Sequence, residues 1–213
     1  MMLPGCMFDR SSVKPACVPD VTAVPAVVAR GGSVVLTGLA GGVGADATLG
    51  MTSQPAVGAA VTVALLPVGA DGRVQLTVRP AMNTTYSLSY SGTSTIAPAQ
   101  ADVRVLVRRS VALVGVTSSS VASARVGRSV RIIASVGPAA AGVSVSLRMY
   151  RYDVGRRLWV YASSRGLTSD ATGRVSSTWT PTSSGSFYWR AVVASTADYA
   201  NNISPVYRWS VSR

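Results

Sequence analysis

The 213-residue sequence contains no histidine and no glutamate, and only one of its 20 basic residues, Lys14, is a lysine. All eight acidic residues are aspartates. These absences exclude a histidine general base, a histidine metal ligand and a glutamate general acid. Serine is abundant, but the chain has no histidine or glutamate to activate a serine nucleophile. We therefore predict that the protein is not an enzyme.

Cysteine is also scarce, and both cysteines, Cys6 and Cys17, lie in the first twenty residues. A disulfide between them would close a small N-terminal loop and fit an oxidising compartment, but two free thiols fit the sequence as well. Two cysteines without histidine cannot complete a zinc site. The glycine-rich stretch 38–50 has neither a phosphate-loop lysine nor a dinucleotide fingerprint. We predict no metal and no cofactor.

Long hydrophobic runs are missing as well. A membrane-spanning helix needs roughly 20 apolar residues, and no run in the sequence approaches that length. We predict no transmembrane segment. Hydrophobic residues make up 48% of the chain and charged residues only 13%, a balance that argues against a long disordered tail.

The charge that is present is unevenly distributed. The net charge is +12; residues 1–108 hold seven basic and five acidic residues, giving +2, and residues 109–213 hold thirteen and three, giving +10. A strongly basic half favours a polyanionic partner. The preference for arginine, alongside abundant alanine, valine and glycine, is also typical of a GC-rich genome. In that case the charge would govern only solubility and nonspecific adhesion.

The dominant pattern is alternation with a period of two residues. It is clear in residues 73–79, 103–108 and 143–150, where valines and leucines alternate with arginine, serine, threonine and glutamine. Such runs predict strands with one buried and one exposed face. They are bounded by glycine, proline, asparagine and aspartate, and no capped amphipathic helix of three turns is evident. The predicted fold class is all-β.

The pattern occurs twice. Gly72, Pro80 and Tyr86 have the same spacing as Gly173, Pro181 and Phe187, namely eight and then six residues. This spacing indicates a tandem repeat of about 100 residues. Several short strands per hundred residues favour a β-sandwich for each repeat. We therefore predict an irregular N-terminal segment over residues 1–20, a first domain over 21–108 and a second over 109–213.

The residues from Arg79 to Arg108 resemble the C-terminal half of bacterial immunoglobulin-like repeats found in secreted and surface actinobacterial proteins. The matching elements are Pro80, Thr84-Thr85-Tyr86, Tyr90-Ser91-Gly92, Ala97-Pro98 and the valine strand ending at Arg108, with residues 185–191 as the counterpart in the second repeat. The resemblance implies two tandem immunoglobulin-like β-sandwiches and a secreted or cell-surface accessory module. Since the sequence as given shows no signal peptide, this location is implied by the resemblance alone. The family frame points Phe187, Trp189 and Ala191 inward.

The resemblance also suggests a candidate site on the second domain. Three of its strands should be neighbours in one sheet, and their exposed face would carry Arg148, Tyr150, Tyr152, Tyr188, Arg190 and Arg208. Arginine offers a planar donor fork for phosphate or carboxylate, and tyrosine a flat surface for sugar rings.

The primary expectation is a surface spacer, adhesion or structural element. The alternative is a binding module for an anionic cell-wall polymer or glycan. The same residues also fit an ordinary solvated face, since arginine and tyrosine are good strand formers, or a contact with a neighbouring domain. Because no RNA-binding strand motif, zinc finger or helix-turn-helix pattern is present, we expect no nucleic acid partner.

Overall fold

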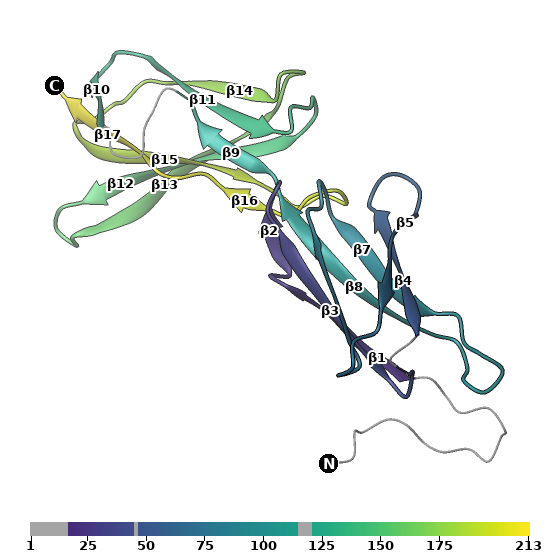
Figure 1. The fold of residues 1–213 in the computed structure, drawn as a ribbon. Coiled ribbons are helices and arrows are strands. Elements are labelled where there is room, and N and C mark those ends of the chain that lie inside the picture. Colours follow the sequence, from purple (N-terminus) through teal and green to yellow (C-terminus); the bar gives the residue numbers. More distant parts are fainter. Residues whose placement is uncertain (1–16, 45–46, 115–120) are drawn as a thin grey trace. The chain divides into compact units, whose positions relative to one another are not determined.

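The computed structural model describes residues 17–44, 47–114 and 121–213, with side chains described from residue 20 onward. Every regular element in these ranges is a strand, and no helix occurs in them (Figure 1). The prediction of an all-β chain is therefore confirmed. The chain divides into two compact units, Met1–Arg108 with Ala197–Tyr199, and Arg109–Thr196 with Ala200–Arg213.

Unit 1 contains two sheets whose strands alternate along the chain. One sheet has the order β1-β3-β6 and the other the order β2-β8-β7-β4-β5. The strands are β1 (Cys17–Val24), β2 (Val27–Ala29), β3 (Val34–Gly41), β4 (Thr48–Pro55), β5 (Val61–Pro67), β6 (Arg73–Val78), β7 (Thr84–Tyr90) and β8 (Ala99–Arg108). All pairs are antiparallel except β2 with β8, which run parallel.

The core of unit 1 lies between these two sheets. Strands β3 and β7 alternate between buried and partly buried residues along their whole length, as a period of two requires. Val34 and Leu36 of β3 are buried with Met51 of β4 and Leu88 of β7, so both sheets contribute to one apolar layer. This packing of two sheets face to face makes unit 1 a β-sandwich.

Unit 2 repeats the arrangement. One sheet has the order β14-β11-β9 and the other the order β10-β17-β15-β12-β13, with β16 paired to β15. The strands are β9 (Ser110–Leu113), β10 (Val121–Arg125), β11 (Val130–Gly137), β12 (Ser144–Asp153), β13 (Leu158–Thr168), β14 (Arg174–Trp179), β15 (Gly185–Val193), β16 (Asn202–Ile203) and β17 (Tyr207–Ser212). Here β10 and β17 form the parallel pair.

Aromatic side chains dominate the second core. Phe187, Trp189 and Ala191 on β15 are all buried, as the family frame predicted. The half-buried Trp179 of β14 makes edge contacts with Trp189 and with Trp209 of β17, with ring centroids 5.8 Å and 6.0 Å apart. The indoles thus span the space between the two sheets and anchor them.

The order of strands is that of an immunoglobulin-like sandwich. In each unit the strands of one sheet are interleaved along the chain with those of the other, which produces Greek-key connections. The five-stranded path of each unit corresponds to the larger immunoglobulin sheet, and the three-stranded sheet faces it. The prediction of two tandem immunoglobulin-like β-sandwiches is confirmed.

Two details differ from the predicted boundaries. Strand β1 begins at Cys17, so the last four residues of the predicted irregular segment 1–20 belong to a strand, in which Cys17 and Asp20 pair with Gly41 and Leu39 of β3. The short segment Ala197–Tyr199 belongs to unit 1 although it falls within the range predicted for the second domain. Tyr199 is buried in the first core, and the amide nitrogen of Asn83 donates to the carbonyl of Asp198 at 2.7 Å.

The two alternatives for Cys6 and Cys17, a disulfide or two free thiols, both stay open. Cys6 lies outside the described residues, and only the backbone of Cys17 is described.

Candidate functional site

The predicted site residues lie on one face of the larger sheet of unit 2. Strands β17, β15 and β12 are neighbours in that order, as the sequence predicted. Arg148 pairs with Arg190 across β12 and β15, Tyr150 pairs with Tyr188, and Tyr188 pairs in turn with Arg208 of β17. Directly paired residues point to the same side of a sheet, and on β15 and β17 the residues Tyr188, Arg190 and Arg208 alternate with buried ones.

Two further aromatic residues join this face from the edge strand β13. Trp159 pairs with Tyr152 and Tyr161 pairs with Tyr150. Neither residue was among the predicted site residues. Residues 158–161 (Leu-Trp-Val-Tyr) alternate after the turn 154–157, and closing that hairpin places Leu158 opposite Asp153. Counting outward from the turn would have identified both residues.

The five rings pack against one another. Tyr150 stacks on Tyr188 with ring centroids 4.6 Å apart and planes 17° from parallel. Trp159 meets the edge of Tyr188 at 4.8 Å and of Tyr152 at 5.2 Å, and Tyr161 meets the edge of Tyr150 at 5.7 Å. The rings contact one another across neighbouring strands, so the cluster stabilises the sheet. Its outer surface also gives a ligand an aromatic area to contact. We call these five rings with Arg148, Arg190 and Arg208 the aromatic–arginine face.

Positive charge is concentrated beside the rings. Arg148 and Arg190 lie directly opposite each other, an arrangement of like charges that destabilises a strand pair. The guanidinium carbon of Arg190 lies 5.7 Å from the ring centre of Tyr188, within range of a cation–π contact. The Nε atom of Arg190 is buried and has no hydrogen-bond partner among the described residues. An anion bound between the two arginines would relieve their repulsion.

Partial burial also alters the tyrosine at the centre of the face. Desolvation raises the pKa of the Tyr188 hydroxyl above its ordinary value, and Arg190 partly opposes that shift by stabilising the phenolate. Tyr188 is therefore a neutral hydrogen-bonding group at physiological pH.

A shallow depression adjoins the same face. It has a volume of about 490 Å³ and is lined by Ser144, Ser146, Arg148, Val192, Val193, Ala194, Ser195 and Asn201. Its polar groups are hydroxyls, one amide and one guanidinium, a set that suits hydroxyl-rich or anionic ligands. Arg148 thus belongs both to the aromatic–arginine face and to this depression.

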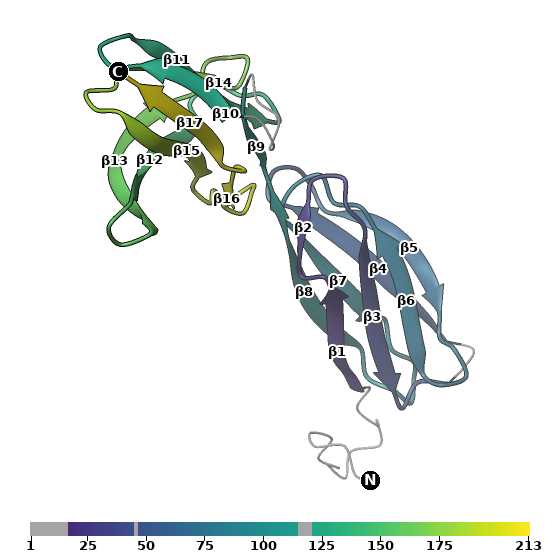
Figure 2. The same cartoon turned by 90° about the vertical axis from the view of Figure 1, so that its left-hand side faces the viewer.

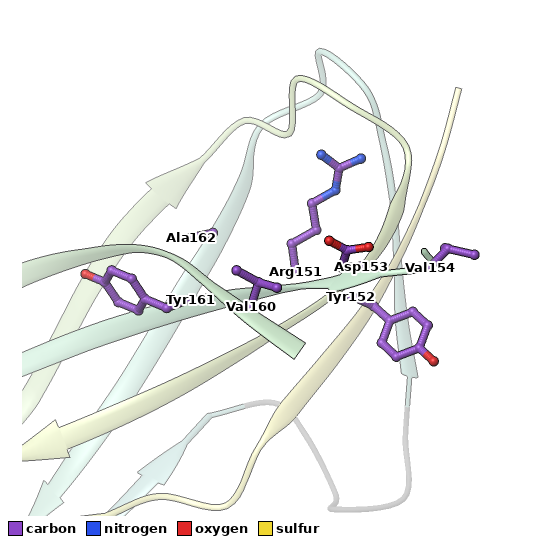
Figure 3. Close-up of a pocket in the computed structure, with 7 residues that line it drawn as sticks. All are labelled: Arg151, Tyr152, Asp153, Val154, Val160, Tyr161 and Ala162. Carbon is purple, nitrogen blue, oxygen red and sulfur yellow. The ribbon is translucent and has the colours of Figure 1, made fainter. Parts of the chain in front are cut away.

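A second depression of about 490 Å³ lies at the end of the β12–β13 hairpin. Figure 3 shows its lining residues, with Arg151 and Tyr152 projecting to opposite sides of their strand. Its two charged groups have opposite signs. The carboxylate of Asp153 lies 3.8 Å from the Nε of Arg156 and accepts a 3.0 Å hydrogen bond from the Arg156 amide. This local neutralisation makes the hairpin depression a weaker anion site than the one at Arg148.

Among the described residues, no group of three or more cysteine, aspartate, glutamate or histidine side chains is placed to hold a metal ion. The same part of the chain contains no helix with the length and hydropathy needed to cross a bilayer.

No family model matches the chain, and no curated protein matches it significantly. Structural matches include the D0-D1 domain of intimin, at 15% identity over 91% of this chain and 98% of that chain, with a TM-score of 0.35. Fibronectin(III)-like modules of Clostridium thermocellum CbhA match at 12% identity over 91% and 94%, with a TM-score of 0.27. A chimeric titin tandem matches at 16% identity over 91% and 100%, with a TM-score of 0.30.

Proposed function

We propose that the chain is a non-catalytic extracellular module of the bacterial immunoglobulin-like type, acting as a spacer, adhesion or structural element on a cell surface or in a secreted protein. The proposal is supported above all by the parallel pairing of the short second strand of each unit with its last strand, β2 with β8 and β10 with β17. An inventory without histidine or glutamate supports the absence of catalysis.

The parallel pairs determine how each unit responds to a pulling force. In unit 2 a force applied to the two chain ends first loads β9, the strand that precedes β10. Once β9 has separated from β11, the force acts along β10 and β17 in opposite directions, so the hydrogen bonds between these two strands are loaded together in shear. Five residue pairs, Val121 with Arg208 through Arg125 with Ser212, share the load in unit 2, and three pairs share it in unit 1. Such an arrangement suits a module that transmits tension.

Single-molecule stretching of the full chain tests this role. We expect two unfolding events, each releasing roughly 300 Å of chain. In β10 the substitution Ala122→Pro should lower the force of one event. The backbone amide of Val126 donates a hydrogen bond to the carbonyl of Ser212 on β17. Along a parallel strand, the amides of residues two apart point to the same neighbouring strand. The amide of Ala122 therefore also faces β17, and proline at this position would remove its hydrogen bond.

The neighbouring residue provides a matched control. The amide of Ser123 faces away from β17, so Ser123→Pro should leave both forces close to those of the unaltered chain. Unfolding of both units without a resolvable force peak would reject the mechanical role. Detectable hydrolysis of a wall polymer by the purified chain would reject the non-catalytic part of the proposal.

A second candidate function is binding of an anionic cell-wall polymer or glycan through the aromatic–arginine face. It is favoured by the opposed pair Arg148 and Arg190, which an anion would stabilise. A neighbouring domain with an acidic surface would satisfy the same charges. Exposed charges are screened over about 10 Å at 0.1 M salt, so polymer binding should weaken steeply with salt.

Titration with heparin as the polyanionic probe tests this candidate. The double variant Arg148→Ala/Arg190→Ala should lose most of the affinity. The control Arg128→Ala/Arg131→Ala removes the same charge from exposed positions near and on β11, in the smaller sheet, and should lose much less. Equal losses in the two variants would show that only net charge matters, and the face would then not be a binding site.

A further inference from the structure

One edge of unit 1 carries a strand with unpaired backbone and apolar side chains. Strand β5 is the last strand of its sheet, and no described strand pairs with its outer side (Figure 2). Val61, Val63 and Leu65 on this strand are 56%, 42% and 71% exposed. An exposed row of amides and carbonyls on an apolar strand is a template for another strand.

The strand also lacks the charges that usually prevent such pairing. From Ala47 to Ala70 the sequence has no charged residue, although the whole chain carries +12. The nearest arginine on β6, the edge strand of the facing sheet, is Arg73, which lies 3.8 Å from the carboxylate of Asp71. A second copy of β5 therefore meets no charged side chain along this strand.

The equivalent edge of unit 2 is protected. Strand β13 carries Arg165 and follows Arg156 and Arg157 in the preceding turn. The Nη1 atom of Arg165 donates a 2.8 Å hydrogen bond to Ser177 on β14, the edge strand of the facing sheet. Charge placed on an edge in this way prevents edge-to-edge association. The two units have the same strand order, and only the first leaves this edge uncharged.

From this contrast we propose that two copies of the chain associate through β5, which pairs antiparallel with β5 of the second copy across a two-fold axis. A two-fold contact is self-complementary, so each copy supplies the same row of donors and acceptors. The proposed contact uses this one edge of each chain and is closed by its two-fold axis, so the assembly ends at a dimer. The partner is a second copy because the strand carries no charged side chain, so two basic chains can pair along it without bringing like charges together.

Sedimentation velocity of the full chain over increasing concentration tests the proposal, in reducing buffer so that Cys6 and Cys17 form no cross-links. We expect a reversible monomer–dimer equilibrium. Val63→Lys places two like charges near the axis and should raise the dissociation constant more than about tenfold. Leu65→Lys is the second variant, and far-UV circular dichroism verifies that both are folded.

Val154→Lys is the matched control, because it adds the same charge at a valine that is 78% exposed in the β12–β13 turn. This variant should dimerise like the unaltered chain. Raising salt from about 0.15 M to about 1 M should strengthen the dimer, because it screens the repulsion between the two basic chains. A chain that stays monomeric, a dimer unaffected by both β5 lysines, or growth beyond a dimer would each overturn the proposal.

Discussion

At the turn between β13 and β14 a single carboxylate organises the backbone. One oxygen of Asp170 accepts hydrogen bonds from the hydroxyl and amide of Thr172, at 2.6 Å and 2.8 Å, and from the amide of Arg174 at 3.0 Å. The pKa of Asp170 lies below its ordinary value of 3.8. The largest cause is the hydrogen bond from the Thr172 hydroxyl, and the next is the hydrogen bond from the Arg174 amide. Asp170 followed by Gly173, which has a φ of +73°, supplies the residue types that turns favour.

The lowered pKa predicts acid sensitivity of unit 2. The folded state holds the proton of Asp170 more weakly than the unfolded state, so the stabilisation is present above pH 3.8 and is lost as the pH falls through the lower folded-state pKa. Asp170→Ala should therefore be less stable than the unaltered chain near pH 6 and nearly equal to it near pH 2. Urea unfolding followed by tryptophan fluorescence measures the difference.

The variant Thr172→Ala checks the cause. It removes the largest contribution to the pKa shift and keeps the carboxylate, so its pH dependence should lie between those of the unaltered chain and Asp170→Ala. A gap between the unaltered chain and Asp170→Ala that stays constant down to pH 2 would show that the hydrogen bonds of the ionised carboxylate are not its source.

At the scale of the strand, the paired arginines of β12 and β15 should have opposite effects on folding stability and on anion binding. Arg148 is exposed and lies across from Arg190, so Arg148→Thr removes a like-charge pair and places a good strand former there. We expect the free energy of unfolding to rise by about 0.2–1 kcal/mol. Heparin affinity should fall in the same variant.

Arg131→Thr serves as the comparison, because Arg131 on β11 donates to Ser176 across β14 and faces no like charge there. This substitution should lower stability slightly or leave it unchanged. If Arg148→Thr is destabilising, its side chain contributes packing that outweighs the repulsion, and the physical basis of the anion site is lost.

Sequence pattern predicts much of this sheet and misses its edge. The alternation of Val145, Leu147 and Met149 with exposed residues assigned the inner face of β12 correctly, because side chains alternate strictly along a strand. Trp159 and Tyr161 were missed because their place depends on hairpin register, which the turn at residues 154–157 sets. The start of β1 was also missed, since pairing with β3 gives no local sequence signal.

At the scale of the whole molecule, the two cores are built from different residue types. All four tryptophans, Trp159, Trp179, Trp189 and Trp209, belong to unit 2, whereas the buried residues of unit 1 are mainly valine, leucine and tyrosine. Tryptophan fluorescence therefore reports on unit 2 alone. The repeat in the sequence predicted two cores, but the membership of Tyr199 in the first depends on tertiary packing.

Paired substitutions in the two cores test whether their stabilities are separate. Leu147 in unit 2 and Leu88 in unit 1 are both fully buried, and truncating either to alanine should cost its own unit about 2–5 kcal/mol. Leu147→Ala should lower the urea midpoint of the fluorescence transition. Leu88→Ala should leave that midpoint unchanged and instead shift the far-UV circular dichroism signal, to which both units contribute. If Leu88→Ala moves the fluorescence midpoint as far as Leu147→Ala does, the two sandwiches unfold as one cooperative body, and two separate events under tension would no longer be expected.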